Sequence, residues 1–447
     1  MGREAGPKAS PKRLSRYLEA VAAVDEFRHY GVVTQVVGLT LVADGPRANL
    51  GELCYIDRAD QEPLPAEVVG FSDKKLLLMP LGELDGIGPG NVVTAARTSL
   101  RIKVGPELLG RVIDGLGEPI DGKGAIHTCQ WYPLQRQPPN PLTRQRIQSP
   151  LSVGVRAIDG LLTCGSGQRV GIFAGSGVGK STLLGMMARN TTAEINVIAL
   201  IGERGREVRE FLERDLGEEG LRRSVVVVAT SNEPALIRLK AAYAATAIAE
   251  YFRDQGHTVL FMMDSVTRFA AAQREIGLAT GEPPATRGYP PSVFAMLPKL
   301  LERTGPGPEG TITAFYTVLV EGDDMNEPIA DAVRGILDGH IVLSRKLADQ
   351  GHYPAIDVLA SVSRVMPEVV SAKHLQDAAR VKELLATYFE HEDLINIGAY
   401  QSGTNPRVDE AIEYHESINN FLVQSVNEVA RLEDTINALQ AVVRQDR

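Results

Sequence analysis

The chain has 447 residues, of which 44% are hydrophobic and 23% charged, with a formal net charge of −9. This length predicts two or three domains with ample apolar material for a core. The acidic balance disfavours non-specific nucleic-acid binding. The sequence contains no run of about 18 apolar residues, so we expect no transmembrane helix. The three cysteines and eight histidines show no metal-ligand spacing. We therefore expect neither a disulfide framework nor a protein-held metal site, and we expect a cytoplasmic protein.

The first part of the chain predicts a mobile segment and a small β domain. Residues 1–20 are polar and basic and lack the apolar core of a secretory signal. Over 30–96, short β-branched runs alternate with Gly, Pro and Asp, which is the pattern of a small antiparallel barrel. We place this barrel domain at 21–97. The proline-rich stretch 133–147 predicts an extended crossing segment.

From about residue 150, apolar runs alternate with helical stretches. The runs are 168–174, 195–202, 224–231, 258–265 and 311–320. Continuous apolar strands separated by helices predict a parallel sheet with both faces covered. The fold class is therefore α/β, with a core domain expected at 98–365 and a helical domain at 366–447.

Apolar residues near the C-terminus recur every seven positions. They are Leu422, Val429, Ile436 and Val443, with Ile418, Leu432 and Leu439 interleaved. This spacing predicts one face of a helix. Such a face either packs within the C-terminal domain or binds a partner.

The segment AGSGVGKST, 174–182, follows an apolar run and opens a predicted helix, which is the context of a phosphate-binding P-loop. Its glycines let the backbone N–H groups approach phosphate oxygens, and the helix N-terminus adds its dipole. Lys180 can reach the β- and γ-phosphates, and the Ser181 hydroxyl can ligate Mg²⁺. Ala174 stands where the strict pattern begins with glycine, and a plain glycine-rich turn is the alternative. The expected nucleotide-binding residues are Gly175, Ser176, Gly177, Val178, Gly179, Lys180, Ser181 and Thr182.

Two acidic residues follow apolar strands. Asp264 ends the run 258–265, at the sheet edge where open α/β sheets bind ligands, and is expected to hold Mg²⁺ through water. The alternative for Asp264 is a helix N-cap. Glu203 follows the run 195–202 and could polarise a water for attack on the γ-phosphate. The alternative for Glu203 is an exposed loop carboxylate.

Three further motifs accompany the P-loop: GERGRE at 202–207, MMDSVTR at 262–268 and YPAIDVLASVS at 353–363. In this order and spacing they resemble the rotary and export ATPase superfamily, which comprises the F- and V-type ATPase subunits and the ATPases of type III secretion. The segments 173–191, 199–211 and 320–345 resemble secretion-type ATPases more than the F-type catalytic subunit. The wording of the P-loop favours the flagellum-specific export ATPases, with injectisome ATPases as close relatives. The resemblance covers nearly the whole chain and implies a RecA-like P-loop core that hydrolyses ATP with Mg²⁺.

The resemblance also implies roles for individual residues near the phosphates. Glu203 matches the catalytic glutamate and Lys180 the phosphate-binding lysine. Arg204 matches the arginine beside the glutamate, and Arg268 matches a further active-site arginine.

The resemblance extends to the base and to the neighbouring subunit. Tyr353 matches the aromatic residue that packs on adenine, and Tyr400 is a second candidate for that pocket. Arg364 matches an arginine that reaches into the neighbouring subunit's nucleotide site, where a guanidinium stabilises transition-state charge. The alternative for Arg364 is a local salt bridge.

The family's assemblies imply partners. They are a homohexameric ring, a stator-type negative regulator on residues 1–20, a central stalk protein, an export gate and chaperone–substrate complexes, with no nucleic acid. The loops 279–296 and 320–331 resemble the family's pore-side and nucleotide-responsive segments. The basic segment 1–20 also predicts contact with an acidic membrane surface, at the inner face of the cytoplasmic membrane.

Three other functions fit parts of this pattern. A catalytic subunit of a rotary ion-translocating ATPase would share the chemistry and differ in its partners. A noncatalytic nucleotide-binding subunit would lack Glu203. A hexameric RNA translocase would need basic and aromatic residues interleaved, and 30–96 has few aromatics and no basic stripe.

Overall fold

The computed structural model describes residues 30–59, 61–320, 322 and 324–444. The regulator-binding segment expected at 1–20 lies outside the described residues. The chain divides into two compact units, Met1–Ser99 and Leu100–Arg447.

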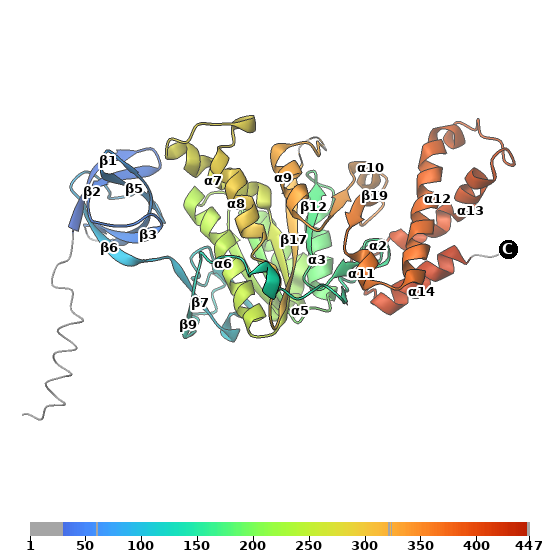
Figure 1. The fold of residues 1–447 in the computed structure, drawn as a ribbon, viewed down its shortest axis with the longest axis horizontal. Helices are drawn as coiled ribbons and strands as arrows, with labels where there is room; N and C mark the ends of the chain where they lie inside the picture. Colours follow the sequence, from blue (N-terminus) through green and yellow to red (C-terminus); the bar gives the residue numbers. More distant parts are fainter. Residues whose placement is uncertain (1–29, 60, 321, 323, 445–447) are drawn as a thin grey trace, which may run out of the picture. The chain divides into compact units, whose positions relative to one another are not determined.

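The first unit contains a closed six-stranded barrel, which confirms the predicted antiparallel barrel (Figure 1). Its strands run in the order β1-β2-β5-β4-β3-β6, and all neighbours are antiparallel. Inward side chains such as Val33, Leu41 and Leu78 are fully buried and form the barrel core. The strands are β1 (Tyr30–Val37), β2 (Thr40–Asp44), β3 (Glu52–Arg58), β4 (Gln61–Ser72), β5 (Lys75–Pro80) and β6 (Val92–Ser99).

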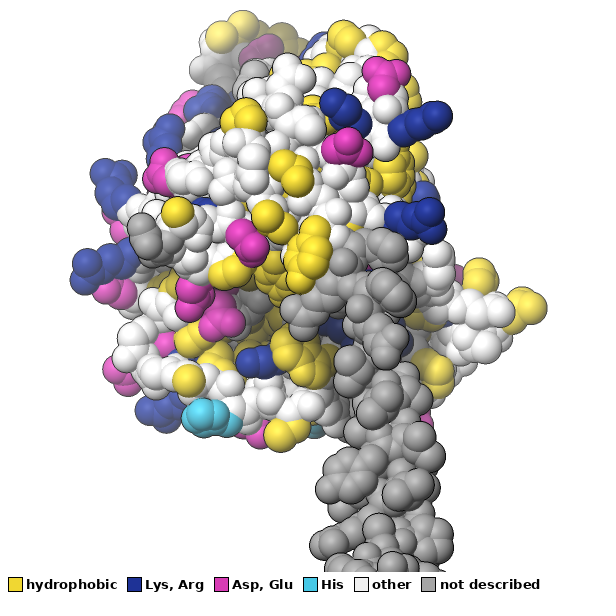
Figure 2. Space-filling view, turned by 90° about the vertical axis from the view of Figure 1, so that its left-hand side faces the viewer, with side chains coloured by type: hydrophobic (Ala, Val, Ile, Leu, Met, Phe, Trp, Pro, Cys, Tyr) yellow, Lys and Arg dark blue, Asp and Glu magenta, His cyan; other side chains and the backbone are white. Residues whose placement is uncertain are grey.

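The molecular surface gives no sign of a nucleic-acid-binding stripe on the face that Figure 2 views. There, apolar side chains gather between side chains of both charge signs. On the outside of the barrel, Tyr30, Val37 and Phe71 are each at least half exposed. A backbone-binding surface for RNA would need basic residues of one sign along a groove. This face therefore disfavours the RNA translocase alternative.

The second unit is built on a nine-stranded sheet whose central strands are parallel. The five predicted apolar strands are confirmed as β12, β13, β14, β15 and β17, and their near-complete burial explains their continuous apolar sequence. In spatial order the strands are β19 (Ile356–Ser363), β18 (Gly339–Leu343), β12 (Arg169–Ala174), β17 (Thr311–Leu319), β15 (Thr258–Asp264), β13 (Ile195–Ile201), β14 (Ser224–Ala229) and β8 (Arg111–Asp114), while β16 (Gly305–Pro306) pairs with β17. Two small hairpins pair β7 (Arg101–Val104) with β9 (Gln130–Pro133), and β10 (Pro150–Leu151) with β11 (Cys164–Gly165).

Helices cover the sheet in two layers (Figure 1). One layer contains α6 (Ala235–Asp254), α7 (Val266–Ala279), α8 (Pro291–Leu301) and α9 (Pro328–Ile336), which contact one another in series and pack on the central strands. The other contains α3 (Lys180–Asn190), the short α4 (Gly205–Glu210) and α5 (Gly217–Arg222), and the π-helical turn η3 (Phe211–Leu216). This layering buries both sheet faces and leaves the carboxyl ends of the strands open for ligands.

The C-terminal region is helical, as predicted. The helices are α10 (Arg345–Asp349), α11 (Met366–Val369), α12 (Ala372–Asn396), α13 (Pro406–Leu422) and α14 (Leu432–Val443), and the last three pack on α2 (Arg156–Leu161). The prediction that the seven-residue repeat forms one helix face is wrong, because the chain is not helical between Val423 and Arg431. Arg156 explains the break, since its guanidinium donates to the Phe421 and Val423 carbonyls.

A buried ion pair holds the start of the proline-rich stretch that follows β9. Arg303 and Glu250 are each 1% exposed, and the guanidinium meets the carboxylate in two hydrogen bonds of 2.7 and 2.9 Å. Arg303 also donates to the Leu134 carbonyl at 2.6 Å. This arrangement satisfies the buried charges and ties the crossing segment to α6 and α8.

Candidate nucleotide site

The P-loop connects the carboxyl end of β12 to the first turn of α3, as the motif predicts. Gly177 and Gly179 have φ of +79° and +87°, which L side chains rarely adopt. A Cβ at Gly177 would meet open space, so the backbone here is accessible to a ligand. No side chain caps α3, and its first N–H groups face the loop. This is the anion-binding geometry of a helix N-terminus.

A pocket of about 640 Å³ opens over this loop. Its lining includes the P-loop residues Gly175, Ser176, Gly177, Gly179, Lys180, Ser181 and Thr182, together with Glu203, Arg204, Arg268 and Arg345. Val178 does not line it, because its side chain is buried beneath the loop. The sequence motifs on three strands therefore meet at one edge of the sheet.

Lys180 lies between the two predicted acidic residues. Its ammonium group pairs with Asp264 and lies 3.5 Å from Glu203 Oε1. Asp264 is 4% exposed and accepts a hydrogen bond of 2.6 Å from the Thr317 hydroxyl on β17. Burial lowers the pKa of Lys180, but the two carboxylates outweigh it and hold the pKa above its usual value. Lys180 is therefore charged and already placed for an anion.

The electrostatic environment of Glu203 favours its protonated form. Burial and the nearby Asp264 carboxylate raise its pKa to about 7, against the opposing effect of Lys180. Its Oε1 atom is buried and accepts no hydrogen bond. A buried carboxylate oxygen that lacks a donor, in a pocket with a P-loop, can accept one from a water molecule.

The two neighbouring arginines are both exposed at the pocket wall. Arg204 is 82% exposed and pairs with Glu207 at 3.6 Å. Arg268 lies in the first turn of α7, and its side chain passes Gly202, where an added Cβ would come within 2.9 Å of it. Neither guanidinium is locked in a buried pair, so both can turn toward a phosphate.

The two predicted adenine-pocket tyrosines lie in different places. Tyr353 packs against the P-loop, because its Cε1 would lie 3.3 Å from a Cβ at Gly179. Tyr400 does not line the pocket: it lies between α12 and α13, where its hydroxyl donates to Asp409 at 2.9 Å. Tyr400 follows the end of α12, which spans roughly 37 Å, and its adenine-pocket role stays a prediction.

Arg364 follows β19, and it lies at the opposite end of the sheet's strands from the P-loop. Ser363 pairs with Gly339, whereas the P-loop end of β12 pairs with Leu343. A strand of this length rises roughly 16 Å, so Arg364 cannot reach its own chain's phosphate site. It can serve a nucleotide site only on another copy of the chain.

Sequence reasoning missed two residues at the P-loop pocket. Arg345 starts α10 and donates to the Ser176 carbonyl at 3.1 Å. Thr317 orients Asp264, as described above. Both had a signal, because Arg345 follows an apolar strand at the ligand-binding edge and Thr317 interrupts an apolar run.

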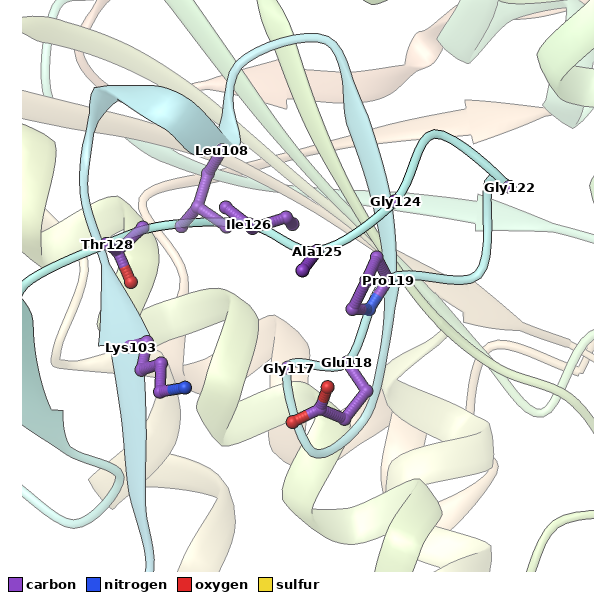
Figure 3. Close-up of a pocket in the computed structure, with 10 residues that line it drawn as sticks. All are labelled: Lys103, Leu108, Gly117, Glu118, Pro119, Gly122, Gly124, Ala125, Ile126 and Thr128. Atoms are coloured by element: carbon purple, nitrogen blue, oxygen red, sulfur yellow. The ribbon is translucent and has the colours of Figure 1, made fainter.

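A second pocket, of about 550 Å³, lies away from the P-loop (Figure 3). Lys103 on β7 and Glu118 on the turn after β8 lie on either side of it in the lower part of the view, below Ala125 and Ile126. One cation and one anion give no excess positive charge for a polyphosphate. We assign this pocket no part in nucleotide binding.

Within the described residues, no group of three His, Cys, Asp or Glu side chains could hold a metal ion by itself. None of the described helices is long and apolar enough to cross a membrane. A cation at the P-loop would therefore depend on Ser181, Asp264 and the bound nucleotide together.

Comparison with known proteins decides the family. Residues 154–363 match the nucleotide-binding domain of the ATP synthase alpha/beta family, and residues 33–96 match the family's β-barrel domain. A flagellum-specific ATP synthase of Bacillus subtilis (strain 168) is 58% identical over 427 residues, covering 95% of this chain and 98% of that protein. The chain belongs to the ATP synthase alpha/beta family.

Other members of the alpha/beta family that resemble the chain act in secretion. Residues 370–441 match the C-terminal domain of the type III secretion ATPase EscN. A type 3 secretion system ATPase of Xanthomonas euvesicatoria is 56% identical, over 93% of this chain and 94% of that protein. The solved structure of the assembled ATPase EscN from enteropathogenic E. coli has a TM-score of 0.88 and 51% identity, covering 92% of this chain and 100% of that chain. EscN in complex with its central stalk EscO gives a TM-score of 0.86 at 50% identity.

Proposed function

We propose that the chain is a Mg-dependent ATPase that drives flagellar protein export through a type III secretion apparatus, as a homohexameric ring. Identity of 58% across 95% of the chain to a flagellum-specific relative carries this proposal. The match at 370–441 to a secretion-type C-terminal domain favours export over a rotary catalytic subunit. An injectisome ATPase is the second candidate, because a relative at 56% identity is named for type 3 secretion.

The P-loop residues bind the polyphosphate. The N–H groups at Gly175 to Thr182 and the Lys180 ammonium face the phosphate oxygens. Ser181 would ligate Mg²⁺ directly and Asp264 through water. The fit rests on the arrangement of Asp264 and Glu203, a buried and a partly buried carboxylate that share a single lysine. When bound with ATP, Mg²⁺ supplies positive charge that neutralises the developing charge on the phosphates.

The remaining residues orient and activate the attacking water. Glu203 accepts a proton from that water as it attacks the γ-phosphate in line. Arg204 and Arg268 stabilise negative charge at the pocket wall, and Tyr353 provides a flat surface for the adenine ring. Arg364 reaches the site of the neighbouring copy, where such guanidinium groups contribute roughly 10³–10⁵ in rate in related systems.

Ring assembly explains why Arg364 lies at the wrong edge for its own site. The assembled relative and its complex with a central stalk support a homohexamer with a stalk partner. We further propose a stator-type regulator on residues 1–20, contacts with an export gate and chaperone–substrate complexes, and a cytoplasmic location beside the inner membrane face.

Concentration dependence of the ATPase rate tests the proposal. Rate per chain should rise as rings form, with particle mass measured in the same samples. Arg364→Ala should form rings and remain slow. A rate per chain that is flat with concentration and equal in Arg364→Ala would reject the homohexameric mechanism in favour of a heteromeric ring.

Deletion of residues 1–20 tests the regulator assignment. Basal hydrolysis should persist, and binding of the stator-type regulator should be lost. Regulator binding that survives the deletion would refute the assignment.

A further inference from the structure

Three charged side chains come from adjacent positions across one edge of the sheet: Arg169 on β12, Asp338 before β18 and Arg364 after β19. The register places them side by side, because Gly171 pairs with His340 and Gly339 pairs with Ser363. The charges alternate in sign, with the single carboxylate between two guanidinium groups. Which arginine holds that carboxylate decides what the other can do.

Arg169 takes both oxygens of Asp338. Its Nε and Nη2 atoms donate to Oδ2 and Oδ1 at 3.1 Å each, and its backbone N–H donates to Oδ2 at 3.1 Å. The Arg169 side chain is 14% exposed, so this two-pronged pair is largely shielded from water. Burial opposes the charge, yet Asp338 and Glu302 hold the pKa of Arg169 above its usual value.

Arg364 has no such partner. Its side chain is exposed, and it makes no ion pair with any of the residues the structure describes. Its Nη1 donates only to the Leu337 carbonyl, at 3.3 Å, while its backbone N–H donates to the Asp338 carbonyl at 3.1 Å. Asp338 thus lies next to Arg364 across the pair of β18 and β19, while its carboxylate is held by Arg169.

We propose that Arg169 sequesters the Asp338 carboxylate and so keeps the Arg364 guanidinium free to enter the nucleotide site of a neighbouring copy. This inference rests on the proposed role of Arg364 in trans. Arg169 and Asp338 are positioning residues in this scheme, and neither touches the nucleotide.

The physical reason is competition for one anion. If Arg169 loses its charge, Asp338 can rotate about its side-chain bonds and pair with the exposed Arg364 of its own chain. An exposed ion pair of this kind changes the ratio of paired to unpaired Arg364 by roughly two- to fivefold. We therefore expect Arg169→Gln to lower kcat by roughly two- to fivefold. The KM for ATP should not change, because the P-loop lies at the other edge of the sheet.

A purely structural role for Arg169 is the competing explanation. Arg169 also pairs with Glu302 at 2.5 Å, which in turn contacts Arg144 at 3.3 Å. Losing these contacts could slow the enzyme by loosening the fold. The two explanations differ in what a second substitution at Asp338 does.

The test compares Arg169→Gln with Arg169→Gln/Asp338→Asn in full-length rings, measuring kcat, KM and particle mass. Sequestration predicts that the double variant is faster than Arg169→Gln and returns to the rate of Asp338→Asn alone. A structural role predicts that the double variant is as slow or slower, since a further contact is removed. Arg169→Gln/Glu302→Gln is the matched control and should stay slow.

Two further arms separate the possible failures. In an Arg364→Ala background, adding Arg169→Gln should change nothing, because no guanidinium remains to be captured. A fast Arg364→Ala ring would overturn both the trans role and this inference. A slow Arg364→Ala ring, together with an Arg169→Gln ring that Asp338→Asn does not rescue, would overturn the inference alone. If Arg169→Gln does not assemble, Arg169→Lys with and without Asp338→Asn decides the same question, since lysine keeps the charge but cannot hold both oxygens.

Discussion

Replacing Glu203 by glutamine should separate hydrolysis from nucleotide binding. Loss of a general base costs roughly 10²–10⁴ in kcat. The same change should not weaken ATP binding, because it removes a negative charge that lies 3.5 Å from Lys180 in the phosphate pocket. Oε1 accepts no hydrogen bond, so the amide leaves no protein donor unpaired.

Because the pKa of Glu203 is raised, we expect the Glu203→Gln substitution to increase the stability of the folded chain. A carboxyl whose folded pKa exceeds its unfolded value destabilises the fold as pH rises from about 4.5 toward 7. At pH 8 this cost is on the order of 3 kcal/mol, and the neutral amide avoids it. Glu203→Gln should therefore unfold at a temperature equal to or above that of the native chain.

The assay combines steady-state ATPase rates at pH 8, binding of a fluorescent ATP analogue and thermal unfolding. Glu213→Gln is the matched control, because it makes the same chemical change in an exposed pair with Arg209 and should leave the rate unchanged. A Glu203→Gln ring that binds ATP and retains more than about a tenth of the native kcat would refute the assignment of Glu203 as the base.

Three further predictions follow from the same geometry. The native kcat/KM for ATP should rise with pH through about 7 as Glu203 of the free enzyme loses its proton, and a pH profile of kcat/KM without this acid limb would contradict its role. Gly179→Ala should weaken ATP binding and lower the melting temperature, because φ is +87° and the new Cβ would crowd Tyr353 at 3.3 Å, whereas Gly205→Ala, which meets open space, is the control. Arg303→Met should destabilise the chain by about 3–5 kcal/mol in thermal unfolding by stranding the buried Glu250, and Arg303→Met/Glu250→Gln should recover part of that loss.

Local patterns predicted most of the nucleotide site. The P-loop needs only consecutive residues, because glycines at Gly177 and Gly179 and the start of α3 determine its backbone. Asp264 and Glu203 were found because each follows a buried strand, and parallel strands end at one edge. These residues could therefore be predicted without knowing the order of the strands in the sheet.

One expectation failed where a long-range contact overrides the local pattern. The seven-residue repeat continues through Val423 to Arg431, yet Arg156 takes the helix carbonyls and ends α13 at Leu422. The deciding partner, Arg156, lies far outside the repeat in the sequence. The adenine-pocket role of Tyr400, whose hydroxyl donates to Asp409 in the first turn of α13, stays a prediction.

The sequence by itself determined the fold class, the P-loop and the acidic residues, because each depends on backbone preferences and burial within a few neighbouring positions. Only the tertiary structure decided that Thr317 orients Asp264, that the Gln424 N–H binds the Tyr353 carbonyl at 2.9 Å, and that Arg169, Asp338 and Arg364 form a row. These contacts join positions far apart in the chain, and strand order and register bring them together. Neither is encoded in any local stretch of residues, since both result from how the whole sheet packs.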